Sequence, residues 1–481
     1  MPERRLDPPR PVGSTDARAD SQAGAAAPRR QLSLFDSTSI IVGIILGVGI
    51  YQTAPDVAKG AGCWWGVLLI WLVGGLLSLC GAMNYAELAT AYPRAGGDYV
   101  YLSRAYGRWA GFLFGWIQLV LVRPGDIAVL AFAFATYALR LWNPGAALEA
   151  FIASAAGGAE QLGGAAATGW GEPLALRLYA GGAVLTLTMV NVLGARAGAW
   201  TQNLLTVVKA LGVLAIVGVG LFGPSAPPAT ADAGGFPLRV ALILVLFTYG
   251  GWNEMAYVAA EVRSPERNIT RALLLGMAAV IVLYLLLNTA FLSALGYAGL
   301  AGSKAVAADT IAATFPRWGG RLIAALICIS ALGALNGQVF TGARILYALG
   351  ADHRAFRALG CWDAVAGAPQ RALVLQGIVA MALILVLGSF IEAVIYTAAA
   401  VYLFYGATSL SVIVLRRREP NVARPYRVTG YPLTPVVFCA VCGLLIYSAF
   451  VYRPWLSAAA LSIAALGLPV YWLTRKSADP R

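Results

Sequence analysis

The sequence predicts an all-α polytopic membrane protein, on three observations. Hydrophobic residues make up 59% of the 481 residues and charged residues only 12%, whereas soluble domains carry about 25% charge. Apolar runs of about 20 residues recur along the chain, each long enough to cross a bilayer core of about 30 Å. Because lipid offers no water to backbone polar groups, such runs must form helices. The alternating ten-residue segments of a β-barrel are not seen.

The apolar runs predict twelve transmembrane helices. We place them at 36–57, 65–91, 108–140, 177–195, 199–222, 237–262, 269–297, 320–349, 371–389, 391–416, 431–451 and 454–474. Two connections are long: 141–176 is rich in Gly and Ala, and 298–319 contains a short amphipathic piece.

The two ends of the chain differ from the rest. Residues 1–33 are rich in Pro, Arg, Ala and Gly and lack an apolar stretch, which predicts a disordered tail rather than a signal peptide. The transmembrane domain is expected over 34–476, followed by a short tail at 477–481.

The net charge of +13 is distributed unevenly between the two sets of loops. Basic residues gather in one set, most densely at Arg416-Arg417-Arg418, Arg424 and Arg427. Since cytoplasmic loops are enriched in Lys and Arg, this pattern predicts that both termini are cytoplasmic. The net positive charge is thus explained by the orientation of the loops in a cytoplasmic (plasma) membrane, and no nucleic-acid partner is expected.

Histidine and cysteine usage argues against an enzyme. His353 is the only histidine, and most of the six cysteines lie in apolar runs. Cys439 and Cys442 form a lone CxxC inside a hydrophobic span, where two small apolar side chains are the simpler explanation. We therefore expect no metal site, no cofactor and no catalytic activity.

Two predicted spans carry glycine interruptions. The first span contains Ile45-Leu46-Gly47-Val48-Gly49 and the sixth contains Phe247-Thr248-Tyr249-Gly250-Gly251. Glycine in a membrane helix often serves only close packing. However, these two places correspond if 36–222 and 237–416 are inverted repeats with extra helices at 431–474. Such paired interruptions point to a transport site.

A broken helix offers specific chemistry. The second half starts with free N–H groups and a positive dipole end, which suit a carboxylate. Here the N–H groups of Gly47, Val48 and Gly49 would donate to the carboxylate. The first half ends with free carbonyls, and those of Ile45 and Phe247 would accept from an ammonium. One α-amino acid can satisfy both ends.

Several polar residues lie inside predicted spans. Lys209 is a functional candidate because a buried lysine is costly, although it could also snorkel to the interface. Arg123 and Asp126, three residues apart on one helix face, are expected to form an internal ion pair. Asn336 could contact substrate or bond a neighbouring helix. Three glutamates near span ends are expected to pair with loop arginines: Glu87, Glu254 and Glu261.

Four stretches, in order, resemble the L-type amino-acid transporters of the amino acid–polyamine–organocation superfamily. They are 85–107 (YAELATAYPRAGGDYVYLSRAYG), 247–273 (FTYGGWNEMAYVAAEVRSPERNITRAL), 331–352 (ALGALNGQVFTGARILYALGAD) and 415–435 (LRRREPNVARPYRVTGYPLTP). The resemblance covers nearly everything from residue 33 to about 450. It implies a five-plus-five inverted-repeat fold with two further C-terminal helices, in agreement with the twelve spans above.

The resemblance also implies residue roles. Gly47-Val48-Gly49 matches the carboxylate site, Phe247 the aromatic that closes over substrate, and Gly250 the unwound backbone of the sixth span. Lys209 matches a lysine whose ammonium takes the place of sodium in related carriers, and Asn336 matches a pocket residue.

The chain departs from the family pattern at three places. Val48 stands where Ser or Ala is frequent, so a hydroxyl contact is lost. Leu332 stands where some members have an aromatic residue. Some animal members bind a heavy chain through a cysteine in the outer loop after span three. Because residues 141–176 contain no cysteine, we expect no disulfide-linked heavy chain.

The expected function is sodium-independent transport of L-amino acids by alternating access, as an exchanger or facilitator. Neutral substrates are favoured because Asp126 is the only carboxylate expected near mid-membrane. Alternatives are a carrier of cationic amino acids or polyamines, and a proton-coupled symporter, since a desolvated lysine can release its proton. An alternative from a different class of protein is an amino-acid sensor that binds its ligand without transporting it. A channel is disfavoured because no filter repeat is present.

Overall fold

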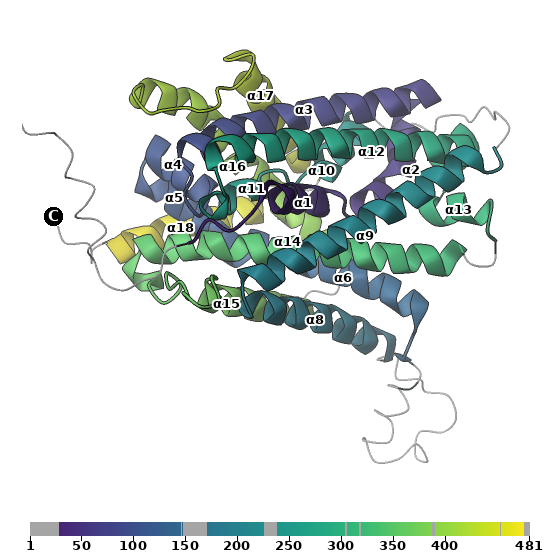
Figure 1. Ribbon diagram of the computed structural model, residues 1–481, viewed down its shortest axis with the longest axis horizontal. Coiled ribbons are helices and arrows are strands. Elements are labelled where there is room, and N and C mark those ends of the chain that lie inside the picture. The colour runs from purple at the N-terminus through teal and green to yellow at the C-terminus, as the bar shows by residue number, and fades with distance from the viewer. Residues whose placement is uncertain are drawn as a thin grey trace, which may run out of the picture.

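The computed structural model describes residues 28–145, 147, 171–225, 238–303, 305–316, 319–386, 390–452 and 454–475 (Figure 1). Within these residues the regular elements are helices, with two isolated β-bridges.

The first half of the chain contains α1 (Leu34–Ile45), α2 (Gly49–Ala61), α3 (Trp64–Ala91), α4 (Asp98–Tyr106), α5 (Arg108–Ile117), the π-helical turn η1 (Gln118–Val122), α6 (Arg123–Leu141), α8 (Gly171–Val192) and α9 (Ala195–Phe222). The second half contains α10 (Leu238–Thr248), α11 (Glu254–Tyr257), η2 (Ala259–Glu261), α12 (Pro265–Gly302), α13 (Val306–Ala312), α14 (Gly319–Asp352), η3 (Arg354–Phe356), α15 (Gln370–Val386), α16 (Phe390–Arg418), α17 (Leu433–Tyr452) and α18 (Pro454–Arg475).

The helices confirm a polytopic membrane architecture. In the described part of the chain, nine helices are long and apolar enough to cross a bilayer, or ten if the bent pair α1–α2 is one span. α15 is apolar but shorter, and α10 ends at the second glycine interruption. The count of twelve spans and the inverted repeat remain predictions.

Local sequence fixes both ends of the first broken helix. Ser33 and Asp36 form a capping box at the start of α1: the Ser33 hydroxyl accepts from the Asp36 amide, and the Asp36 carboxylate accepts from the Ser33 amide. This satisfies N–H groups that would otherwise be unpaired. α2 is capped at its C-terminal end by Gly62, whose φ of 72° is easily adopted only by glycine.

The segment before α1 also has a defined place. The amides of Gln31 and Leu32 both donate to the Glu261 carbonyl at 2.8 Å, and the Arg263 amide donates to the Leu32 carbonyl at 2.9 Å. The predicted tail over 1–33 therefore ends in residues that pair with the last residue of η2 and with Arg263 after it. Most of that tail lies outside the described residues.

α1 occupies the centre of the bundle. It packs against α9, α11, α12 and α14, while α2 packs against α10 and α12. Figure 1 shows α1 and α11 in the middle of the molecule, with α3 and α12 on one side and α14 and α6 on the other. The two helix breaks are thereby brought together.

Candidate functional site

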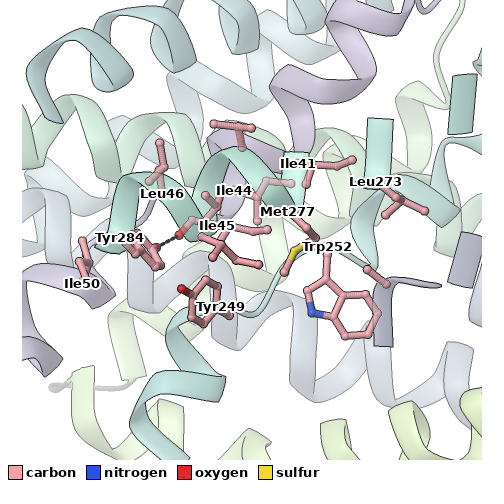
Figure 2. Close-up of a cluster of buried hydrophobic side chains, with 14 of the residues drawn as sticks. Ile41, Ile44, Ile45, Leu46, Ile50, Tyr249, Trp252, Leu273, Met277 and Tyr284 are labelled. Carbon is pink, nitrogen blue, oxygen red and sulfur yellow. Dashed lines mark hydrogen bonds between the residues drawn. The ribbon is translucent and has the colours of Figure 1, made fainter. Parts of the chain in front are cut away.

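The first span is broken where the sequence predicts. α1 ends at Ile45, α2 begins at Gly49, and the two helices are bent by 51°. Both breaks lie within one cluster of buried apolar side chains, contributed by several helices (Figure 2). The backbone groups freed by the break therefore need partners from the protein or from a ligand.

Side chains from three other helices bind the free carbonyls of this break. Lys209 of α9 donates to the Gly43 carbonyl at 2.6 Å, and Ser330 of α14 donates to the Leu46 carbonyl at 2.8 Å. The Tyr284 hydroxyl of α12 donates to the Ile45 carbonyl at 2.6 Å (Figure 2). The C-terminal end of α1 is thus anchored to α9, α12 and α14.

The sixth span is broken between α10 and α11, over residues 249–253. Gly251 has a φ of 115°, and a Cβ atom there would lie 2.7 Å from Ile44 Cγ2. Glycine is therefore required both for the backbone conformation and for the close approach to α1. The Tyr284 hydroxyl also lies 3.4 Å from the Thr248 carbonyl, so it bridges the ends of both broken helices.

The start of α2 offers unpaired donors. Among the described residues, no acceptor bonds the amides of Val48 and Gly49. Gly47 and Gly49 are partly accessible, whereas the neighbouring Leu46 and Val48 are buried. A Cβ atom on Gly47 would meet only the Ile44 and Ile45 carbonyls, at 3.6 and 3.8 Å. The unpaired amides of Val48 and Gly49 are the kind of donors that an anion would need.

The carbonyls predicted to receive an ammonium already have donors in this conformation. The Ile45 carbonyl accepts from Tyr284 and from the Gly47 amide, both at 2.6 Å. The Phe247 carbonyl accepts from the Gly250 amide at 2.9 Å. The Phe247 side chain is 43% exposed, so it does not close over the breaks here. An ammonium would have to replace some of these donors.

Lys209 is completely buried. A Cβ atom on Gly333 would lie 3.0 Å from the Lys209 ammonium nitrogen, so glycine lets this side chain approach α14 closely. Lys209 therefore contacts α1 and α14, as expected if it ties spans one, five and eight together. Its side chain therefore does not extend to the membrane interface.

Asn336 lies in a buried polar cluster formed by α8, α9 and α14. Its amide donates to the Gly198 carbonyl at 3.1 Å and to Gln202 Oε1 at 3.0 Å, and its oxygen accepts from Asn191 at 2.9 Å. Of the two roles considered for Asn336, the bond to neighbouring helices is present in this conformation.

The predicted ion pair between Arg123 and Asp126 is wrong. The Arg123 guanidinium donates to Glu254 at 2.9 Å and to Gln338. It therefore lies toward α11 and α14. Thr341 donates to the other Glu254 oxygen at 2.5 Å. The cause is tertiary packing: α6 packs against α14, and the buried Glu254 carboxylate of α11 accepts from the guanidinium, whose Nε has no partner among the described residues.

The prediction that Glu87, Glu254 and Glu261 pair with loop arginines is correct only in part. Glu87 accepts from Arg416 at the end of α16 and lies 3.5 Å from Arg424 in the following loop. Glu261, by contrast, binds Arg344 within α14 through two hydrogen bonds of 2.7 and 3.1 Å.

Sequence reasoning missed Tyr284 and Ser330. The available signal was weak: each is a polar side chain within an apolar run, 239 and 284 residues from its carbonyl partner. In the described residues, no group of three or more His, Cys, Asp or Glu side chains could hold a metal ion.

Comparison with known proteins bears directly on this site. The amino acid permease family matches residues 32–473, nearly the whole chain and both helix breaks. The chain belongs to this family. The permease is thus an integral membrane protein of a transporter family, as the resemblance implied.

Individual relatives of the permease are distant but cover most of its length. The mouse "b(0,+)-type amino acid transporter 1" is 28% identical over 440 residues, covering 89% of this chain and 84% of the relative. The mouse "Large neutral amino acids transporter small subunit 2" is 29% identical over 478 residues, covering 96% and 84%. The human protein of that name is similar to the same extent.

Proposed function

We propose that this permease transports L-amino acids without sodium, by alternating access, as an exchanger or facilitator. The observation that carries the proposal is the meeting of the two helix breaks. Unpaired amides at Val48 and Gly49 lie on one side, and the carbonyls of Ile45 and Thr248 lie on the other, bridged by Tyr284.

This arrangement fits the two charged groups that every α-amino acid has. The carboxylate accepts from the amides at the start of α2, where the helix dipole favours negative charge. The ammonium replaces the Tyr284 hydroxyl as donor to the Ile45 carbonyl. Gly47 and Gly250 leave room for this contact, because both are partly accessible and neither has a side chain. Phe247 then closes over the substrate.

Lys209 supplies a fixed positive charge next to the break, through its 2.6 Å hydrogen bond to the Gly43 carbonyl. In a sodium-coupled carrier, unwound carbonyls of this kind coordinate the ion. A protonated lysine in that place removes the need for sodium. A neutral Lys209 that exchanges its proton during the cycle would instead give proton coupling.

For the substrate side chain we propose a neutral residue as the main cargo, since Phe247, next to the second break, is apolar. The names of the relatives also support amino-acid transport. We further propose the five-plus-five inverted repeat, cytoplasmic termini, and function without a disulfide-linked subunit. One relative is named a small subunit, but residues 141–176 of this chain contain no cysteine. Residues 146 and 148–170 of that loop lie outside the described residues.

Uptake of labelled amino acids into proteoliposomes tests the proposal. The vesicles are either empty or preloaded with amino acid, with and without a sodium gradient. Uptake that ignores sodium and rises with internal amino acid supports an exchanger. A requirement for sodium would contradict the role given to Lys209. Binding of amino acids without flux would favour a sensor, and uptake of polyamines alone would favour an organic-cation carrier.

A further inference from the structure

Asp98, the first residue of α4, is a completely buried carboxylate without a cationic partner. It lies on the connection between α3 and α5, at the end of the bundle that the proposed topology places on the cytoplasmic side. The hydroxyls of Tyr85 and Thr408 both donate to its Oδ1 atom, the latter at 2.5 Å. Its Oδ2 atom has no hydrogen-bond partner, and no ion pair reaches the carboxylate among the described residues. Because buried charges are normally paired, this carboxylate is a candidate for a change of charge state.

The two hydroxyls that bind Asp98 come from different helices. Tyr85 belongs to α3 and Thr408 to α16, so the carboxylate ties both of these helices to the start of α4. At the other end of α4, the Tyr106 hydroxyl donates to the Ala407 carbonyl of α16 at 2.8 Å. The short helix α4 is thus fastened to α16 at both of its ends, and Asp98 is one of the contacts that close this end of the bundle.

Direct contacts connect this closure to the second helix break. The Gly96 amide donates to the Tyr257 carbonyl at 3.3 Å, and a Cβ atom on Gly97 would lie 2.6 Å from the Tyr257 ring. The Tyr85 ring packs edge-on against Trp252, with the ring centroids 5.0 Å apart. Trp252 lies in the unwound segment, and Tyr257 is the last residue of α11. The second half of the broken span six is therefore held against α3 and α4 where the buried carboxylate lies.

The groups around Asp98 do not neutralise a charge on it. Among the described residues, the titratable groups that interact with it are four tyrosines and one carboxylate: Tyr85 of α3, Tyr101 of α4, Glu254 and Tyr257 of α11, and Tyr405 of α16. The Arg123 guanidinium is already bound to Glu254 at 2.9 Å. Burial raises the pKa of Asp98 to about 6, although the hydroxyls that donate to it, Thr408 first, act to lower it. In water the pKa of an aspartate is about 4.

We propose that Asp98 is a proton-binding site that controls the opening of the cytoplasmic side of the carrier. This rests on the proposed function, because alternating access requires that side to open and close. In the closed conformation seen here the carboxyl group is buried, whereas opening admits water, which stabilises its charged form. A proton therefore binds the closed conformation more tightly than the open one, and by linkage acid stabilises the closed conformation. Transport should slow as the pH falls through about 6.

The test measures the exchange of labelled leucine against internal leucine in proteoliposomes, with equal pH on both sides. For the wild type we expect the rate to fall by about tenfold between pH 7 and pH 5. Asp98→Asn cannot become charged, so its rate should be low throughout this range and should not depend on pH. Its equilibrium affinity for leucine should match that of the wild type, because the helix breaks are unchanged. A merely structural role would not remove the pH dependence.

Thr408→Val tests the same site without removing the carboxylate. The substitution deletes a hydroxyl that donates to the charged carboxylate, so it should move the midpoint of the pH profile upward by about one pH unit. Thr289→Val is the matched control, because the Thr289 hydroxyl donates within its own helix, to the Leu285 carbonyl at 2.8 Å. Its profile should coincide with that of the wild type.

Three results would overturn the inference while leaving amino-acid transport in place. They are a wild-type rate that does not change between pH 7 and pH 5, an Asp98→Asn profile equal to that of the wild type, and an unchanged midpoint in Thr408→Val. If Asp98→Asn does not bind leucine, the midpoint of Thr408→Val decides the question alone. Absence of exchange of any amino acid by the wild type at every pH would instead overturn the proposed function.

Discussion

The Tyr284 hydroxyl donates to the Ile45 carbonyl at 2.6 Å and lies 3.4 Å from the Thr248 carbonyl. One side chain of α12 therefore holds the ends of both broken helices. The same carbonyls are the acceptors that a substrate ammonium would need. The hydroxyl thus stabilises the breaks in the absence of substrate and competes with substrate for one acceptor.

Tyr284→Phe should tighten substrate binding. Removal of the hydroxyl frees the Ile45 carbonyl at a cost of about 0.5–1.5 kcal/mol in stability, typical of one hydrogen bond. The same free energy no longer opposes the ammonium, so the dissociation constant should fall by up to about tenfold. Equilibrium binding to purified protein measures this. Tyr297→Phe is the control, because Tyr297 also belongs to α12 but donates to the Ala58 carbonyl outside the break. Equal affinities in all three proteins would refute the competition.

Lys209→Ala should reduce transport by at least about tenfold while the protein still reaches the membrane. The substitution removes the charge beside the break and the donor to the Gly43 carbonyl. Lys209→Met keeps most of the volume and should be equally inactive if the charge matters. Uptake per reconstituted protein is the measurement, and Lys59→Ala, on the exposed pair with Asp56, is the control. Wild-type-like uptake by Lys209→Ala would remove Lys209 from the mechanism.

Gly47→Leu should abolish binding with little loss of stability. A Cβ atom at this position meets only backbone oxygens at 3.6 Å or more, so the fold tolerates it and the side chain enters the proposed carboxylate site. Gly182→Leu is the matched control, since nothing lies within 4 Å of a Cβ atom there. Substrate affinity and melting temperature are measured together. If Gly47→Leu bound substrate normally, the carboxylate site would have to lie elsewhere.

Glu261→Gln should destabilise the protein by about 3–5 kcal/mol, because it leaves the buried Arg344 without its partner. Both side chains of this pair are fully buried, and Glu261 also holds Gln31 and Leu32 through its carbonyl. Thermal unfolding in detergent measures the effect. The exposed Glu266→Gln serves as control. A melting temperature unchanged by Glu261→Gln would show that the pair contributes nothing to stability.

Local patterns were sufficient to predict the breaks, because both are marked by glycine, and at Gly251 the φ of 115° is one that glycine adopts easily. They failed for Arg123. Its nearest charge in sequence is Asp126, but its partner is Glu254, which lies 131 residues away. Helix periodicity says which residues share a face, but not which helix that face meets.

By itself, the sequence determined that this chain is a helical membrane protein of a transporter family with two interrupted spans. Hydropathy, glycine placement and motif order are all local properties of the chain. Only the tertiary structure decided which side chains satisfy the backbone groups freed at α1, namely Lys209, Tyr284 and Ser330. The physical reason is that a buried polar group takes whichever partner packing brings within about 3 Å, and packing joins segments far apart in sequence.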